Sequence, residues 1–346
     1  MSEGTAVRVG VIGLGFMGKT HLAAYQAATR DGFPCRLAAV CDPKAERLEG
    51  RIAVDGNVTG DAGEPDFDAS TVLATTDVQE ILASPEVDAV SICTPTDTHV
   101  KLAIAALEAG KHVLVEKPVA ITSTEVGDLA NAARRSDRVC LPAMCMRFWP
   151  GWDWLKDRVV DGEYGAVRSA VFERLSATPT WSGNFYGDET RSGGALIDLH
   201  IHDADFVRYL FGEPTAVTAV GTLTHATVAY HFDRGGPAHV TAEGGWIRAE
   251  GFEFRMRYRV VFEHTAAEFD LLRDPVLRLV KDGAVEPVAL APDMMGYDGE
   301  VRHFVDVIAG RAKPVLSIGD AVATTRLLEA ERASLERGGM AVEVGG

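Results

Sequence analysis

A lysine stands where a buried strand is expected to end. Residues 112–116 (HVLVE) have the near-continuous apolar character of a strand covered on both faces, and Lys117 and Pro118 follow at once. Pro118 fixes the backbone here, a rigidity that a lysine serving only solubility does not need. In open parallel sheets, ligands bind outside the carboxyl ends of the strands. The position predicts that Lys117 faces a ligand; the alternative is an ordinary surface lysine.

A carboxylate and an imidazole recur at helical spacing further along the chain. Residues 192–212 are apolar enough for a mostly buried helix, on which Asp198 and His202 would lie one turn apart on a single face. An imidazole can exchange protons near neutral pH, whereas buried polar groups otherwise need partners. The pair predicts acid–base chemistry or a satisfied internal network. On a helix His200 diverges from His202, so no metal site is predicted, and the role of His200 stays open.

A glycine-rich turn supplies the third chemical feature. Gly13, Gly15 and Gly18 follow an apolar strand and open a helical segment, and Asp42 comes at the end of the next strand. This pattern predicts a dinucleotide whose pyrophosphate lies at the helix N-terminus and whose ribose hydroxyls meet the carboxylate. A carboxylate would repel a 2′-phosphate, so NAD is expected in preference to NADP. Incidental glycines in a strand–helix turn are the alternative.

The predicted cofactor site extends along the same edge of the sheet. Residues 92–99 (ICTPTDTH) end another strand, beside the one that ends at Lys117. Lys44 and Arg47, close to Asp42, keep NADP as the less favoured cofactor. The predicted cofactor-binding residues are Gly13, Gly15, Phe16, Met17, Gly18, Asp42, Thr94, Pro95, His99, Glu116 and Lys117.

These residues require two kinds of sheet to position them. Apolar strands alternate with helices in the first half of the chain, which predicts an α/β Rossmann domain with a doubly wound parallel sheet. From about residue 212, alternating segments such as 252–264 predict an α+β domain with a large, open, mostly antiparallel sheet. The expected domains are residues 1–147 and 148–346. Residues 55–72, rich in Gly and Asp, are interpreted as an insertion loop.

The expected elements can be stated by residue range. Strands are predicted at 7–12, 36–41, 88–93, 112–116 and 138–145. Helices are predicted at 16–28, 43–52, 78–83, 96–110, 122–136 and 319–337, the fifth with a capping pattern from Thr122 to Glu125.

Composition excludes several classes of function. The 346 residues carry a formal net charge of −16 and no run of basic residues, which argues against nucleic-acid binding. No apolar run approaches the length of a membrane span, so no membrane partner is expected. The five cysteines include no C-x-x-C pair, which is typical of reduced thiols and predicts a cytoplasmic protein.

Tryptophans gather in two segments. Four of the five lie within residues 147–157 and 180–187, where their indoles could cover the apolar face of a sugar or cyclitol ring. Ordinary packing between domains or subunits is the alternative. The candidate substrate-binding residues are Arg147, Trp149, Trp181 and Tyr297.

Together these segments resemble the Gfo/Idh/MocA family, the glucose–fructose oxidoreductase and inositol 2-dehydrogenase family. The likeness is carried by GVIGLGFMGKTH at the start, by TPTDTHVKLAIAALEAGKHVLVEKPVA in the middle, and by SGGALIDLHIHDAD beyond them. It covers most of the chain and is weakest over residues 213–290. The chain differs from the family in Ser192 before the third segment, in the 55–72 insertion and in the extra histidine, His200.

The resemblance implies roles for individual residues. Lys117 resembles the family's catalytic lysine, which holds the reacting hydroxyl near the nicotinamide, and the Lys–Pro bond is often cis in the family. Asp198 resembles its substrate-binding aspartate and His202 its general base. The resemblance also implies a homodimer or homotetramer that assembles through the C-terminal sheet.

Three functions are compatible with these features. The first is an NAD-dependent dehydrogenase that oxidises a secondary hydroxyl of a sugar, sugar derivative, polyol or cyclitol. In this case Lys117, Asp198 and His202 are expected to meet at a cleft between the domains. The second is a glycoside hydrolase of the same architecture that uses bound NAD transiently. The third is a non-catalytic NAD-binding regulator, which would need none of Lys117, Asp198 and His202.

Overall fold

The computed structural model describes residues 6–50, 52, 67–180, 185–233, 236–249, 251–291 and 294–345. By its internal contacts the chain forms two compact units, Met1–Phe148 with Met295–Val322, and Trp149–Met294 with Ala323–Gly346. The first boundary lies one residue from the predicted one. Residues 295–322, which the sequence analysis assigned to the second domain, instead belong to the first unit. Most of the predicted 55–72 insertion, up to residue 66, lies outside the described residues.

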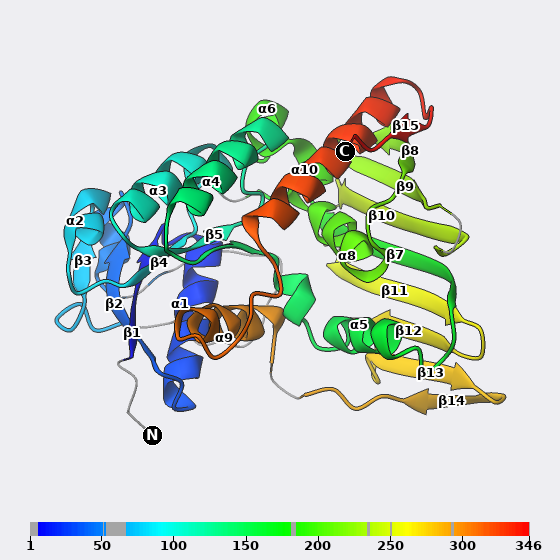
Figure 1. Ribbon diagram of the computed structural model, residues 1–346, viewed down its shortest axis with the longest axis horizontal. Coiled ribbons are helices and arrows are strands. Elements are labelled where there is room, and N and C mark those ends of the chain that lie inside the picture. The colour runs from blue at the N-terminus through cyan, green and yellow to red at the C-terminus, as the bar shows by residue number, and fades with distance from the viewer. Residues whose placement is uncertain are drawn as a thin grey trace. The chain divides into compact units, whose positions relative to one another are not determined.

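The first unit is built on a six-stranded parallel sheet with the order β3-β2-β1-β4-β5-β6 (Figure 1). This is the strand order of the dinucleotide-binding fold, and the point at which the order of the strands reverses lies between β1 and β4. Most positions of the central strands are buried because helices cover both faces. The strands are β1 Val7–Ile12, β2 Cys35–Cys41, β3 Leu73–Thr75, β4 Ala89–Ile92, β5 His112–Glu116 and β6 Cys140–Ala143.

Helices α1 and α9 pack together on one face of this sheet, and α3 and α4 pack together on the other (Figure 1). The capping box predicted at Thr122 is present, with Glu125 as its partner. Residues 43–52 were predicted to be helical, but among the residues of this range that the structure describes only Ala45–Leu48 form a helical turn, of the 3₁₀ type. The α-helices are α1 Phe16–Arg30, α2 Val78–Ala83, α3 Thr96–Glu108, α4 Ser123–Arg135 and α9 Gly296–Ile308.

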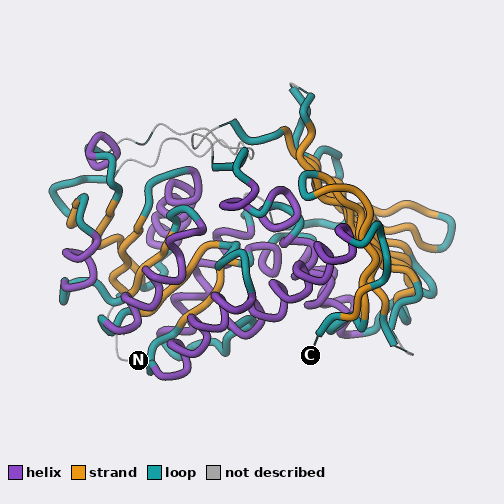
Figure 2. The backbone as a smooth tube through the Cα atoms, turned by 90° about the horizontal axis from the view of Figure 1, so that it is seen from above, coloured by secondary structure: helices purple, strands orange, loops and turns teal. Residues whose placement is uncertain are grey.

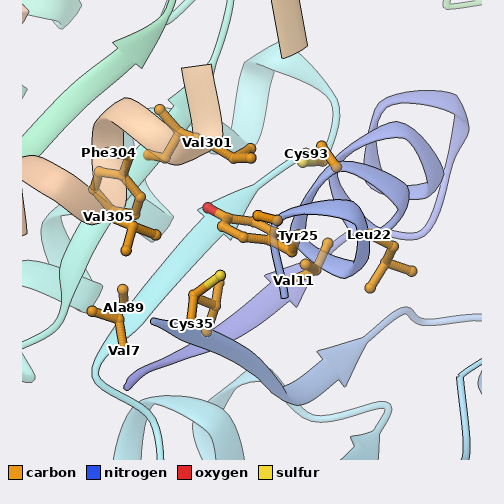
Figure 3. Close-up of a cluster of buried hydrophobic side chains, with 14 of the residues drawn as sticks. Val7, Val11, Leu22, Tyr25, Cys35, Ala89, Cys93, Val301, Phe304 and Val305 are labelled. Carbon is orange, nitrogen blue, oxygen red and sulfur yellow. The ribbon is translucent and has the colours of Figure 1, made fainter. Parts of the chain in front are cut away.

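Helix α9 belongs to the first unit because its apolar face packs in the core there. Val301, Phe304 and Val305 on one face of α9 are fully buried in the same apolar cluster as Val11 and Tyr25 (Figure 3). Burial of a large apolar side chain stabilises a fold by about 1.5–3 kcal/mol, so three such residues hold this helix against α1. The contact between α1 and α9 could not be predicted from the sequence, because the two helices are far apart in the chain.

The second unit is built on a nine-stranded sheet with the order β14-β13-β12-β11-β7-β10-β9-β8-β15. Its strand pairs are antiparallel except for β7 with β10, which run parallel. The sheet is strongly twisted, as Figure 2 shows. The strands are β7 Val167–Ala177, β8 Ala216–Thr222, β9 His225–His231, β10 His239–Ile247, β11 Arg255–Phe262, β12 Ala266–Asp270, β13 Leu277–Lys281, β14 Ala284–Pro287 and β15 Val342–Glu343.

The strand β7 alternates between fully and partly buried positions, as expected for a sheet with one covered face. Trp152 lies in the aromatic core on the covered side, with ring contacts to Phe172, Phe206 and Tyr258. The helices of this unit are α5 Trp152–Asp161, α6 Glu189–Ser192, α7 Gly194–Asp198, α8 Ile201–Phe211 and α10 Ile318–Glu336, the last beginning in the first unit. None of the helices that the structure describes is long and apolar enough to cross a membrane.

Candidate functional site

The glycine turn between β1 and α1 is shaped by contacts that exclude side chains. Gly13 has a φ of +91°, and a Cβ on it would lie 2.7 Å from the carbonyl oxygen of Cys93. A Cβ on Gly18 would lie 1.8 Å from the carbonyl oxygen of Gly13, so only glycine lets α1 approach the turn. A Cβ on Gly15 would meet no protein atom within 4 Å. The backbone at Gly15 therefore leaves room for a pyrophosphate group at the start of α1, as NAD requires.

Asp42 is tied to this turn by hydrogen bonds. It is 2% exposed, and its carboxylate accepts hydrogen bonds from the backbone N–H of Leu14 at 2.7 Å and of Lys44 at 2.9 Å. Arg47 donates to the same carboxylate at 3.1 Å. Each carboxylate oxygen has two lone-pair directions; Oδ2 accepts two of these bonds and Oδ1 one, so Oδ1 can accept one further hydrogen bond from a ribose hydroxyl. The predicted residues Phe16 and Met17 begin α1 directly after the turn, and both are partly buried.

His99 links the ends of two neighbouring strands. Its ring is 1% exposed, with Nδ1 2.8 Å from the carbonyl oxygen of Pro118 and Nε2 2.7 Å from the carbonyl oxygen of Thr94. Burial lowers the pKa of His99, although both carbonyl oxygens oppose that effect. Pro95 is the N-cap residue of α3, and the Thr94 hydroxyl bonds to the Thr98 hydroxyl at 2.6 Å. His99 thus joins the backbone after β4 to the backbone directly after Lys117 rather than facing solvent.

Lys117 follows directly after β5, as predicted, and is partly buried. Its backbone N–H donates to a carboxylate oxygen of Glu116 at 2.9 Å, and the Lys117–Pro118 peptide bond is cis. The other carboxylate oxygen of Glu116 lies 2.9 Å from Nε2 of His21 on α1. Glu116, predicted as a cofactor contact, is 4% exposed and therefore supports the backbone at Lys117.

Two buried residues near Glu116 were not predicted from the sequence. His21 on α1 and Glu300 on α9 join Glu116 in one group, whose donor atoms lie within 4.8 Å of one another. His21 and Glu300 are 0% and 2% exposed. The signal that could have revealed them is a histidine on the apolar face of the first helix and a glutamate among the apolar residues of α9.

Asp198 and His202 do not share one regular helix, so the prediction of an uninterrupted helix over residues 192–212 is wrong. Asp198 ends α7, His202 is the second residue of α8, and the backbone N–H of His200 donates to the carbonyl of Ala195 at 2.8 Å. That bond spans five residues, so the helical turn is widened between the two elements. Asp198 and His202 are both partly buried and lie on either side of this widened turn.

His200, whose role the sequence left open, belongs to a buried polar network of the second unit. Its Nε2 atom lies 3.0 Å from the hydroxyl of Tyr230 and 3.3 Å from a carboxylate oxygen of Glu331. Burial lowers the pKa of His200, but the Glu331 carboxylate more than compensates, and the net shift is upward. Beside it, Asp203 accepts two hydrogen bonds from the Arg174 guanidinium, at 2.8 and 3.1 Å. These side chains fix α8, which carries His202, on the sheet.

The predicted substrate residues have different surroundings. Arg147 is 4% exposed, and within the first unit it donates to Asp320 at 3.3 Å and to the carbonyl of Val315 at 3.2 Å. Trp149 is 6% exposed, in the second unit. Tyr297 lies in the first turn of α9 and is partly buried. Trp181 lies outside the described residues.

Comparisons with known proteins agree with this architecture. A sequence profile described as "Oxidoreductase family, NAD-binding Rossmann fold" matches residues 7–144, and one described as "GFO/IDH/MocA C-terminal domain" matches residues 152–268. A solved structure of levoglucosan dehydrogenase in complex with NADH and levoglucosan superimposes with a TM-score of 0.82 at 23% identity, covering 99% of this chain and 100% of that chain. At that identity the likeness shows the fold.

Two relatives named as dehydrogenases are similar in sequence. The levoglucosan dehydrogenase of Pseudarthrobacter phenanthrenivorans is 34% identical over 62% of this chain and 53% of its own length. The scyllo-inositol 2-dehydrogenase (NAD(+)) of Bacillus subtilis is 27% identical over 91% of this chain and 90% of its own length. The chain spans about half the length of the first curated relatives that it matches, 43% and 53% in two cases. Because profiles for both domains match in chain order, the chain belongs to the Gfo/Idh/MocA family of oxidoreductases, with an NAD-binding Rossmann domain at residues 7–144.

Proposed function

We propose that the protein is an NAD-dependent dehydrogenase that oxidises a secondary hydroxyl of a sugar, sugar derivative or cyclitol. The observation that carries the proposal is the position of Lys117, directly after β5, on a parallel sheet whose glycine turn leaves room for a dinucleotide. The relatives named above act, by their names, on levoglucosan and scyllo-inositol, which supports this substrate class. The Trp149 side chain is the candidate for contact with an apolar sugar face.

The chemistry assigns a role to each of the three predicted catalytic residues. NAD held by the glycine turn and Asp42 would supply the hydride acceptor for the carbinol carbon. His202 takes the hydroxyl proton, and its imidazole is suited to proton transfer near neutral pH. Lys117 stabilises the alkoxide that develops on the oxygen, and Asp198 orients the substrate by accepting a hydrogen bond from a second hydroxyl. The products are a ketone, NADH and one proton.

The deciding experiment is a screen of sugars and cyclitols with NAD, read by the absorbance of NADH. One equivalent of NADH for each substrate consumed supports the dehydrogenase. Turnover of a glycoside without net NADH would indicate the hydrolase, and NAD binding with no turnover of any substrate would indicate a regulator.

Variants test the assigned roles once a substrate is found. His202→Ala should lower kcat by about 10²–10⁴-fold with NAD affinity little changed, and Lys117→Met should lower kcat at least as much. The matched controls are Lys101→Met and His264→Ala, two exposed positions. The rise of kcat/KM with pH should disappear or move in His202→Ala. A His202→Ala enzyme with wild-type kcat would remove the base from the mechanism.

The proposal also includes assembly and location. Homo-oligomerisation through the nine-stranded sheet is supported by the partly buried face of β7, where Val171 lies beside the Glu173–Arg257 ion pair of 3.0 Å. Val171→Glu should lower the mass measured by light scattering if copies pair on this face. A cytoplasmic location is supported by the five cysteines, which are all buried and form no disulfide.

A further inference from the structure

Three titratable side chains from separate elements meet inside the first unit. They are His21 on α1, Glu116 at the end of β5 and Glu300 on α9, with exposed fractions of 0%, 4% and 2%. The Nε2 atom of His21 lies 2.9 Å from one oxygen of Glu116 and 3.8 Å from one oxygen of Glu300. The proposed mechanism uses none of them directly.

The two carboxylates have unequal surroundings. Both oxygens of Glu116 have donors, namely the His21 ring and the backbone N–H of Lys117. Neither oxygen of Glu300 has a hydrogen-bond partner among the residues that the structure describes. An ionised carboxylate without donors in a buried site is costly, and such a group avoids the cost by taking a proton. These contacts favour a carboxylate at Glu116 and a neutral acid at Glu300.

The pKa of Glu300 also supports a neutral acid at this position. Burial, and then the charge of Glu116, raise the pKa of Glu300 well above its ordinary value. The other titratable groups that interact with the two carboxylates are Tyr25 on α1, Cys93 after β4 and His99 on α3, and burial raises the pKa of the first two. Lys117 is the next residue after Glu116, and its charge acts on His99 as well.

A metal ion is the alternative occupant of such a group. The described residues offer three donor side chains, whereas structural zinc sites use four. The 2.9 Å separation of His21 and Glu116 is also an ordinary hydrogen-bond length. The geometry therefore favours a shared proton over a metal.

We propose that His21, Glu116 and Glu300 form a buried proton-sharing cluster that holds the backbone of Lys117 in place, with Glu300 as a neutral acid that leaves the charge on Glu116. The three are positioning residues, since Glu116 acts through the backbone N–H of Lys117. The effect on catalysis rests on the proposed function of Lys117, but the protonation of Glu300 does not.

Infrared spectroscopy tests the protonation state without any activity. A neutral carboxylic acid has a C=O stretch apart from the carboxylate bands, and wild type minus Glu300→Gln should show it at pH 7. The matched control Glu108→Gln, at an exposed site on α3, should show none. Absence of the acid band from the Glu300 difference spectrum at pH 7 would overturn the proposal.

The pH dependence of unfolding gives a second test with a defined sign. A folded pKa above the unfolded value of 4.5 means that the folded state holds a proton that the unfolded state releases. The stability advantage of wild type over Glu300→Gln should then be largest below pH 4.5 and should shrink as the pH rises. The opposite trend would indicate an ionised Glu300, as in a metal site. In that case dialysis against Zn²⁺ or Mn²⁺ should load one ion per chain in wild type and none in Glu300→Gln. Such loading would replace the proposed proton with a metal.

A kinetic test addresses the positioning role once a substrate is known. Glu116→Gln keeps an oxygen that can accept from the N–H of Lys117, whereas Glu116→Ala does not. The alanine variant should lose at least tenfold more kcat than the glutamine variant. Equal losses in the two variants would show that the backbone bond to Lys117 has no positioning role. If no substrate is turned over by wild type, the proposed function fails, while the infrared and unfolding results still decide the cluster.

Discussion

The backbone N–H of Leu14 donates a hydrogen bond of 2.7 Å to the carboxylate of Asp42. The residue expected to bind the ribose therefore also holds the glycine turn, which is expected to bind the pyrophosphate. Two substitutions can therefore separate two roles of Asp42. Its negative charge is expected to select NAD over NADP, whereas its side-chain oxygen accepts the hydrogen bond from Leu14 that supports the turn.

We expect Asp42→Asn to shift the Kd ratio of NAD and NADP toward NADP by about tenfold or more, since a charge-assisted hydrogen bond contributes about 1.5–3 kcal/mol. Arg47, released from its 3.1 Å contact with the carboxylate, can then pair with a 2′-phosphate. Asp42→Ala should weaken both cofactors, because Leu14 loses its acceptor. Isothermal titration of both cofactors checks this. An unchanged ratio in Asp42→Asn would remove Asp42 from cofactor selection.

The glycines of the turn should respond differently to alanine. Gly15→Ala should leave the free energy of unfolding within about 1 kcal/mol of wild type, because its Cβ meets no protein atom, but should weaken NAD binding. Gly18→Ala places a Cβ 1.8 Å from the Gly13 carbonyl oxygen and should cost about 1–3 kcal/mol or more of stability as well. Denaturant unfolding and NAD titration separate the two effects. Wild-type NAD affinity in Gly15→Ala would place the pyrophosphate elsewhere.

His99 should contribute to acid sensitivity. Burial lowers its folded pKa, so the unfolded state binds more protons than the folded state below the ordinary value of 6.5. Its contribution to stability is present above pH 6.5 and decreases as the pH falls, by at most about 1.4 kcal/mol per pH unit. The slope of stability against pH below 6.5 should be smaller in His99→Gln than in wild type, and unchanged in the exposed control His264→Gln. Parallel curves for wild type and His99→Gln would contradict the assignment.

The His200–Glu331 ion pair should change stability with pH in the opposite direction to His99, because the folded pKa of His200 is raised. Glu331→Gln leaves a buried imidazolium without its counter-charge and should destabilise the protein by about 3–5 kcal/mol at acid pH. The raised pKa means that this stability is complete below the ordinary value of 6.5 and is lost as the pH rises through the folded pKa. Thermal unfolding across pH checks it, with the exposed Glu336→Gln as control. If the loss of stability caused by Glu331→Gln increased with pH, His200 would be neutral in the folded protein.

The sequence alone was sufficient to predict those elements whose residues near in the chain determine their structure. The glycine turn, the strand ending at Glu116, α2 at Val78–Ala83 and the capping box at Thr122 all occur where they were predicted. Each depends on neighbouring residues, because turn geometry, capping and strand burial leave signals within a few positions. The family resemblance, carried by these same segments, was confirmed by the profiles for both domains.

Only the tertiary structure decided which distant residues share an interior. Helix α9 packs in the core of the first unit because Val301, Phe304 and Val305 bury their side chains there, and nothing near residue 300 in the chain indicates this. The widened turn at Leu199 and His200 interrupts a segment whose periodicity predicts one helix, and it coincides with the buried contacts of His200 to Tyr230 and Glu331. His21, Glu116 and Glu300 become one electrostatic unit only through folding, since the Coulomb interaction depends on distance in space and on burial, neither of which is encoded in sequence spacing.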